Sequence, residues 1–253
     1  MNKKVCVSIP VRNCEEFLEQ AIISVLSQDY TNLHLNIYDG QSTDNTTKVL
    51  QKYEKVKNVS VVYTTNLNSP CRAIKRCLEL PDADIIIPLM ADDFFIHNSV
   101  VSSFINEFKK NNADFVYGNS YVVDRQNISK ILRKVKNFNY NLDDLKNGNH
   151  PNWSSVAFKK KLIKELDFND NDFEFACDFD FYIKILSNSK YKICHLDNYT
   201  SKHRIGGESS KNILKMICAN HEAYAAWINN GIHVSKLFLL KKPLSKIKQF
   251  FKL

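Results

Sequence analysis

The chain has 253 residues, of which 44% are hydrophobic and 25% are charged, and these proportions are those of an ordinary globular protein with a buried core. It carries a formal net charge of +8 and only six glycines. Because no G-x-G-x-x-G and no G-x-x-x-x-G-K-[ST] motif occurs, a dinucleotide dehydrogenase or a P-loop NTPase is disfavoured.

Short apolar runs alternate with helical repeats through the first half of the chain. Strands are predicted at 5–10, 33–38, 59–63 and 85–90, and helices between them at 15–27, 43–53 and 71–80. The fourth strand is the most apolar and is expected at the centre of the sheet. Strands separated by helices predict an α/β fold with a mostly parallel central sheet flanked by helices.

The second half is less regular. A helix is predicted at 99–110, a strand at 115–117, an extended hairpin at 122–136, a short helix or loop at 142–149, a strand at 153–158 and a helix at 179–186. Neither a linker composition nor an internal repeat is present. We therefore expect one domain over residues 1–222 with a differentiated C-terminal half, followed by a helical tail over 223–253.

The tail carries most of the net positive charge. From Ala223 onward the sequence has six lysines and no acidic residue, so the body is nearly neutral and nucleic-acid binding is not expected. Apolar residues recur there with helical spacing at Leu237, Leu240, Leu244, Ile247 and Phe251. Such a basic amphipathic helix either lies on an anionic membrane surface, which we favour, or packs on the body with solvated lysines.

Cysteine usage and hydropathy suggest a compartment. The seven cysteines form no C-x-x-C pair, and this argues against a disulfide framework or a zinc site and for reduced, mostly buried thiols. No run of about 18 apolar residues occurs, and the N-terminus enters a strand without signal-peptide regions. The expectation is a cytoplasmic protein, peripheral at the inner face of the cell membrane.

Polar and acidic residues follow three of the predicted strands. Asn13 and Glu15 follow the first strand, Asp39 ends the second, and the pair Asp92 and Asp93 follows the central one. Ligands of open α/β sheets bind beyond the carboxyl ends of the strands. Because adjacent carboxylates are costly to hold together without a cation, we expect a divalent metal bound to a nucleotide diphosphate.

Two aspartates at this edge have different interpretations. Asp44 begins a predicted helix and is more typical of a helix cap than of a ligand. Asp39 precedes a glycine and would suit a plain turn, but its place at the end of a strand favours a functional role.

Seven short motifs of the sequence, taken in chain order, resemble those of glycosyltransferase family 2 of the bacterial surface-glycan type. Members of this family have the GT-A nucleotide-sugar-binding fold. The resemblance rests on V-S-I-P-V-R-N-C-E-E-F-L, S-V-L-S-Q, D-G-Q-S-T-D-N-T, L-M-A-D-D, V-Y-G-N, F-A-C-D-F-D and G-G-E-S. These segments extend over roughly residues 4–210. Their number and order make the resemblance specific.

Carried over position by position, the resemblance implies a nucleotide-sugar pocket, a metal and a catalytic base. The pocket would be lined by Pro10, Arg12, Asn13, Glu15, Asp39, Arg72 and Asp92. Asp93 would bind Mn²⁺ or Mg²⁺ on the donor's phosphates, and Asp178 would be the general base. His203 and Arg204 are candidates for added positive charge near the diphosphate. His150 and Trp153 either line the acceptor pocket or simply pack.

The sequence departs from the family pattern at two places. Ala91 stands at the first acidic position of the D-x-D motif, and Cys177 stands where many members have glutamate. The second departure leaves open whether Asp178 or Asp180 is the base.

The implied reaction is the transfer of a sugar, with inversion, from a nucleoside-diphosphate sugar to a glycan or lipid-linked acceptor in surface polysaccharide synthesis. A UDP-sugar is the expected donor. One alternative is a non-catalytic nucleotide-sugar-binding protein of the same fold, which Ala91 and Cys177 would suit. Another is a sugar nucleotidylyltransferase, which would need a glycine-rich basic loop after the first strand where this chain has R-N-C-E.

Overall fold

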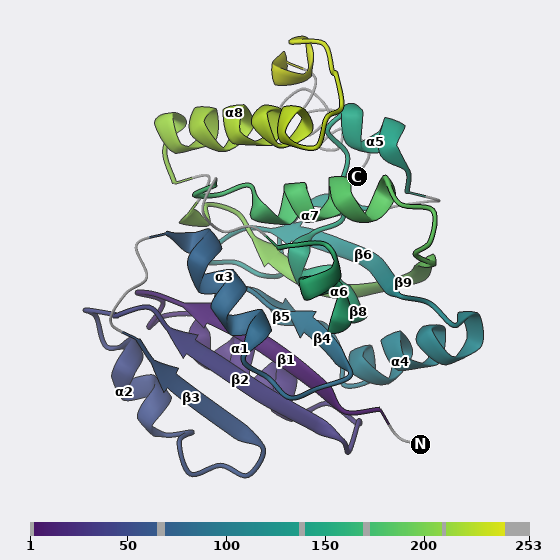
Figure 1. Ribbon diagram of the computed structural model, residues 1–253. Coiled ribbons are helices and arrows are strands. Elements are labelled where there is room, and N and C mark those ends of the chain that lie inside the picture. Colours follow the sequence, from purple (N-terminus) through teal and green to yellow (C-terminus); the bar gives the residue numbers. More distant parts are fainter. Residues whose placement is uncertain (1–2, 65–68, 137–139, 169–172, 209–210, 241–253) are drawn as a thin grey trace.

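The computed structural model describes residues 3–64, 69–136, 140–168, 173–208 and 211–240. Its centre is one mixed sheet with strand order β3-β2-β1-β4-β8-β6-β9-β5, and helices flank this sheet (Figure 1). The first four strands in that order are parallel and comprise β1 (Val5–Val11), β2 (Leu33–Asp39), β3 (Val59–Tyr63) and β4 (Ile85–Pro88). The predicted strands of the first half are therefore confirmed, and β4 lies in the interior of the sheet as expected.

Helices cover both faces of this part of the sheet. They are α1 (Leu18–Leu26), α2 (Thr46–Gln51), α3 (Pro70–Glu79) and α4 (Val100–Asn111). Helix α3 begins where Ser69 accepts a hydrogen bond from the Arg72 amide, with Pro70 in the first turn. Along β1, Val5 and Val7 pack with α1 and α4, whereas Cys6 packs with α3 on the opposite face.

The other half of the sheet is mixed rather than parallel. Strand β8 (Val156–Lys159) runs antiparallel to both β4 and β6 (Phe115–Val123), and β9 (Ile193–Arg204) runs parallel to β6. The short β5 (Phe94–Phe95) pairs antiparallel with β9, and β7 (Ile131–Val135) forms the predicted hairpin with β6. The expectation of a mostly parallel sheet thus holds only for β1 to β4. It fails beyond β4, because β8 lies between β4 and β6 and runs in the opposite direction.

Among the described residues there are four further helices and a short 3₁₀ turn, η1 (Trp153–Ser155), before β8. They are α5 (Leu142–Lys146), α6 (Lys161–Glu165), α7 (Cys177–Leu186) and α8 (Ile213–Asn229). Helix α8 forms the outermost layer, above α7 (Figure 1). Four of the seven cysteines are buried, as predicted: Cys6, Cys71, Cys77 and Cys177.

The expected boundary between a body ending at 222 and a tail beginning at 223 falls inside α8. Ala223 and Trp227 are fully buried in the core that also holds α7, and Phe238 packs on Trp227 with ring centroids 6.2 Å apart. The folded body therefore reaches at least to Phe238, because the tail's first residues supply core side chains. Leu237 and Leu240 are exposed, whereas residues 241–253 lie outside the described residues. Within the described ranges, no helix has the length and apolar character needed to cross a membrane.

Candidate active site

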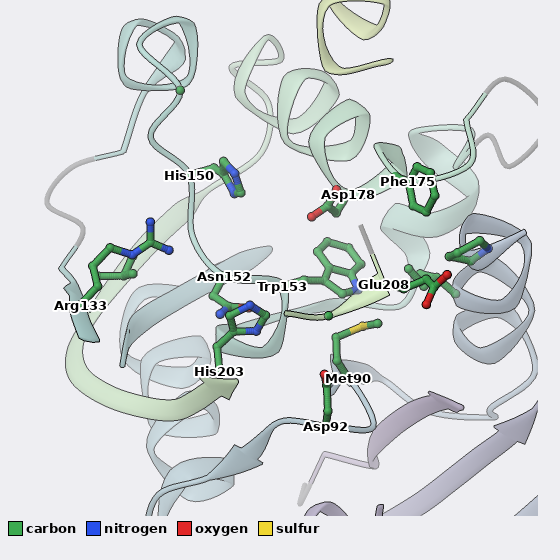
Figure 2. A pocket seen from close by; sticks show the side chains of 15 residues that line it. Met90, Asp92, Arg133, His150, Asn152, Trp153, Phe175, Asp178, His203 and Glu208 are labelled. Atoms are coloured by element: carbon green, nitrogen blue, oxygen red, sulfur yellow. The ribbon is translucent and has the colours of Figure 1, made fainter. Parts of the chain in front are cut away.

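A pocket of about 240 Å³ opens beyond the carboxyl end of β4 (Figure 2). Its walls come from the loop after β4, from β7, from the segment around η1, from the start of α7 and from the end of β9. The lining residues are Pro70, Ile74, Met90, Asp92, Arg133, Val135, Gly148, His150, Asn152, Trp153, Phe175, Asp178, His203, Gly207 and Glu208. The expected site residues Asp92 and Asp178 both line this pocket, and so do His150, Trp153 and His203.

Asp92 is the carboxylate of the D-D pair that reaches the pocket. Its Oδ2 accepts a hydrogen bond of 3.1 Å from Nη1 of Arg125, whose guanidinium lies 4.5 Å from the centroid of the Phe17 ring. Burial, followed by the negative charge of Asp93, raises the pKa of Asp92, although His203 and Arg125 oppose this rise. A cation in the pocket would therefore stabilise the ionised form of Asp92.

Asp93 is turned into the protein and has no exposed surface. Its carboxylate accepts hydrogen bonds from Oγ of Ser154 at 2.5 Å and from the backbone amide of Arg204 at 3.2 Å. Nδ1 of His203 lies 3.0 Å from each of its oxygens. The carboxylate of Asp93, which was expected to contact the metal, thus contacts three protein groups, and Asp93 does not line the pocket.

His203 lines the pocket from the last residues of β9, directly beside the Asp92–Asp93 pair. Burial disfavours a charged ring, but the Asp93 carboxylate, together with Asp92, outweighs burial and raises the pKa of His203. A proton on Nδ1 faces Asp93, so that Nε2 is the ring nitrogen available to a ligand.

Arg204, the other candidate for positive charge, is buried and does not line the pocket. Its guanidinium donates hydrogen bonds to the carbonyl oxygen of Asp92 and to the side chain of Gln20, and it lies against the rings of Phe17 and Phe94. Arg204 therefore fixes the loop that carries the aspartate pair, because its charge is directed at that loop and away from the pocket.

The two candidate bases differ sharply in their surroundings. Asp178 lines the pocket from the first turn of α7, where its Oδ1 accepts a hydrogen bond of 2.7 Å from the amide of Phe179. Asp180 is buried and pairs with Nζ of Lys184 at 2.9 Å and with Nδ2 of Asn230 at 2.6 Å. Figure 2 shows Asp178 and Asp92 at opposite ends of the pocket. Of the two aspartates, only Asp178 lines the pocket.

The segment leading into α7 is held by Glu222 of α8. Its carboxylate accepts hydrogen bonds from the backbone amides of Glu174 at 3.0 Å, Phe175 at 2.7 Å and Ala176 at 3.1 Å. Such amides at a helix N-terminus have no partner within the helix. Sequence reasoning missed Glu222, because 44 positions separate it from Asp178 and no local motif marks it.

The predicted nucleotide-pocket residues after β1 and β2 lie outside this pocket and join two loops. The side chain of Asn13 accepts a hydrogen bond of 2.7 Å from the Thr43 amide, and Glu15 accepts one of 2.8 Å from the Asn45 amide. Asp44 accepts a hydrogen bond of 2.9 Å from the amide of Thr46, the first residue of α2, although the N-cap position expected for it is occupied by Asn45.

The remaining residues of that set lie along the same edge of the sheet. Asp39 is buried at the end of β2 and accepts a hydrogen bond of 2.5 Å from Oγ of Ser42. Pro10 is buried within β1, Arg12 is exposed just beyond it, and Arg72 is half-buried on α3.

Met90, Arg133, Asn152 and Glu208 also line the pocket, and sequence analysis did not single them out. The D-x-D pattern of the sequence could have pointed to Met90. Because Asp92 rather than Asp93 faces the pocket, the first position of a D-x-D pattern ending at Asp92 is residue 90. A thioether therefore stands where the pattern has a carboxylate, one residue before Ala91, the position expected from the sequence.

A helix-flanked mixed sheet, with carboxylates gathered beyond its central strand, defines an enzyme of the GT-A glycosyltransferase class. Residues 6–171 match the model of glycosyl transferase family 2, and the chain belongs to this family.

Individual relatives agree with this assignment. The chain is 27% identical to an uncharacterised glycosyltransferase of Haemophilus influenzae, over 98% of this chain and 92% of that protein. It is 25% identical to WfgD of Escherichia coli, named a UDP-Glc:α-D-GlcNAc-diphosphoundecaprenol β-1,3-glucosyltransferase, over 90% of this chain and 88% of that protein.

Solved structures share the fold at low sequence identity. TarS of S. aureus superposes with a TM-score of 0.68 at 16% identity, covering 94% of this chain and 70% of the other. The mannosyltransferase PcManGT of Pyrobaculum calidifontis, solved with GDP-Man and Mn²⁺, gives a TM-score of 0.66 at 16% identity, covering 96% and 69%.

Proposed function

We propose that this glycosyltransferase moves a sugar, with inversion, from a UDP-sugar to a lipid-linked glycan acceptor in surface polysaccharide synthesis. The observation that carries the proposal is the placement of Asp178 and of the Asp92–His203 pair at opposite ends of one pocket. One end suits an acceptor hydroxyl, and the other suits a diphosphate.

Asp178 acts as the general base in this mechanism. Its carboxylate takes the proton of the acceptor hydroxyl while that oxygen attacks the anomeric carbon, and the bond from this carbon to the diphosphate oxygen breaks on the opposite face. Asp180 is unsuited to the role, because Lys184 and Asn230 already occupy its carboxylate inside the protein.

Asp92 and Nε2 of His203 would hold Mn²⁺ or Mg²⁺. A metal-binding histidine characteristically donates its second N–H to a carboxylate, and His203 faces Asp93 in this way. The described residues contain no group of three or more potential metal-binding side chains, so the donor's phosphate oxygens and water would complete the coordination shell. When bound, the ion neutralises charge on the departing diphosphate. Asp93 then positions His203 and is not itself a metal ligand.

The relatives' names support the proposed donor and acceptor. WfgD, which matches 90% of this chain, is named for UDP-glucose and for an acceptor linked to diphosphoundecaprenol. A mannosyltransferase that shares the fold was solved with GDP-mannose, so the fold by itself does not choose between the two nucleotides. The sequence relative therefore favours a UDP-sugar and a polyprenyl-diphosphate-linked glycan.

The test compares Asp178→Asn with Asp180→Asn in the full chain. We expect Asp178→Asn to reduce sugar transfer about 100-fold or more, while UDP-sugar with Mn²⁺ still raises its melting temperature as in the unmodified protein. Asp180→Asn should lower thermal stability but keep transfer. Full activity of Asp178→Asn would refute the assignment of the base. Donor binding by the unmodified protein, without transfer or donor hydrolysis, would identify a non-catalytic binding protein.

A further inference from the structure

The first turns of α8 expose large apolar side chains. Ala223 and Trp227, in the later turns of this helix, are buried in the core, whereas Ile213, Leu214 and Ile217 are 74%, 77% and 50% exposed. At about 3.6 residues per turn, Leu214 projects from the side opposite Ala223, but Ile213 lies on nearly the same side as Trp227, so the first turns are exposed around most of their circumference. Large apolar side chains that are exposed together in this way normally mark a contact surface.

The exposed surface extends beyond the first turns of α8. Met216 is 52% exposed beside them, and Leu237 and Leu240 are exposed in the segment that follows the helix. Nδ2 of Asn220 donates a hydrogen bond of 2.7 Å to the carbonyl oxygen of Leu239, which ties that segment to α8. We call this surface, made of Ile213, Leu214, Met216, Ile217, Leu237 and Leu240, the α8 apolar surface.

Exposed lysines adjoin the α8 apolar surface, and Glu222 of the same helix is turned to the backbone amides before α7. Lys211 and Lys236 are exposed at its two ends, and Lys215 is neutralised locally by an ion pair with Glu208. From Ala223 to residue 253, lysine is the only charged residue type in the sequence. Apolar side chains among lysines match a bilayer interface with anionic headgroups, where both kinds of side chain are stabilised.

The position of the surface matches that partner. Glu208 lines the pocket, and its ion pair with Lys215 joins the first turn of α8 to the pocket's rim. A lipid-linked acceptor has its glycan in the pocket and its lipid in the bilayer, so an apolar surface is needed close to the rim.

We infer that the α8 apolar surface docks on an anionic lipid bilayer and presents the pocket to a membrane-held acceptor. The acceptor's role in this inference rests on the proposed function. The docking itself rests on exposure and charge, and it is measured without any catalytic step.

The experiment measures sedimentation of the full chain with vesicles of phosphatidylglycerol and phosphatidylcholine. We expect the unmodified protein to bind, and the triple variant Ile213→Gln, Leu214→Gln, Ile217→Gln to bind roughly tenfold or more weakly. The matched control is Ile23→Gln, Leu26→Gln, Leu80→Gln, which changes three apolar residues exposed elsewhere and should bind normally. Glutamine keeps a helix propensity close to that of the residues replaced.

Each outcome decides the inference. If the triple variant sediments like the unmodified protein, the α8 apolar surface is not the membrane contact. The inference is overturned if the unmodified protein does not bind vesicles but forms a dimer, and the triple variant remains a monomer. A second copy of the chain would then cover the surface. Hydrolysis of UDP-sugar in detergent should be equal in both proteins. Absence of UDP-sugar hydrolysis by the unmodified protein would contradict the proposed function, and the vesicle result would still stand.

Discussion

Nδ1 of His203 lies 3.0 Å from both carboxylate oxygens of Asp93, across 110 positions of sequence. This contact fixes the orientation of the His203 ring at the edge of the pocket. It also engages the Asp93 carboxylate, which the sequence had assigned to the metal. The D-D pair therefore has two separate tasks. Asp92 faces the pocket, and Asp93 holds the His203 ring in place.

The first prediction concerns Asp93→Asn. Because the neutral amide no longer holds the His203 ring as firmly, we expect Mn²⁺ affinity in the presence of UDP to fall about 10- to 100-fold. Titration calorimetry measures this change directly, without turnover. Asp92→Asn is the comparison and should abolish Mn²⁺-dependent UDP binding. Unchanged Mn²⁺ affinity in folded Asp93→Asn would contradict the positioning role of Asp93.

The second prediction concerns Glu222→Gln. The amide keeps one oxygen acceptor but loses the charge that strengthens three backbone hydrogen bonds, so unfolding should become about 1–3 kcal/mol easier. Since those bonds hold the segment before Asp178, kcat should fall while UDP-sugar binding stays close to normal. Glu165→Gln, which changes an acidic residue that pairs with lysine and does not line the pocket, serves as the control. A loss of stability with unchanged kcat would show that Glu222 has a structural role only.

The third prediction explains the glycine of the V-Y-G-N motif. A Cβ atom at Gly118 would lie 2.6 Å from Cγ2 of Thr200 on the neighbouring strand β9, closer than packed carbon atoms approach. Gly118→Ala should therefore destabilise the protein by roughly 1–3 kcal/mol, as measured by chemical denaturation. Thr200→Ser removes that methyl group but keeps the hydroxyl that donates to the Asn119 carbonyl. The double variant should regain part of the loss, and a loss as large as in Gly118→Ala would locate the strain elsewhere.

The fourth prediction separates the lysine-rich end from the folded body. Deletion of residues 241–253 leaves Phe238 in the core, so the truncated protein should keep its melting temperature and its transfer to a detergent-dispersed acceptor. Binding to anionic vesicles should weaken and lose part of its salt dependence, because five lysines are removed. Undiminished vesicle binding at low salt would show that these residues do not contribute to membrane contact.

Local patterns were sufficient to predict most elements of the first half. The apolar run that contains β4 and the helical repeat predicted at 71–80 depend on neighbouring residues alone, and both appear in the structure near the predicted positions, the second as α3. The hairpin of β6 and β7 was predictable for the same reason, since its strands are close in sequence. The antiparallel insertion of β8 and the long strand β9 were not, because the pairing of distant strands depends on packing.

The site shows the same division. The sequence by itself determined the fold class, the family resemblance and the presence of carboxylates at the strand ends, because these follow from local periodicity and ordered motifs. Only the tertiary structure decided which member of each acidic pair meets the pocket: Asp92 rather than Asp93, and Asp178 rather than Asp180. That choice depends on partners brought from β9, η1 and the end of α8, and no local pattern encodes which distant donors will surround a carboxylate.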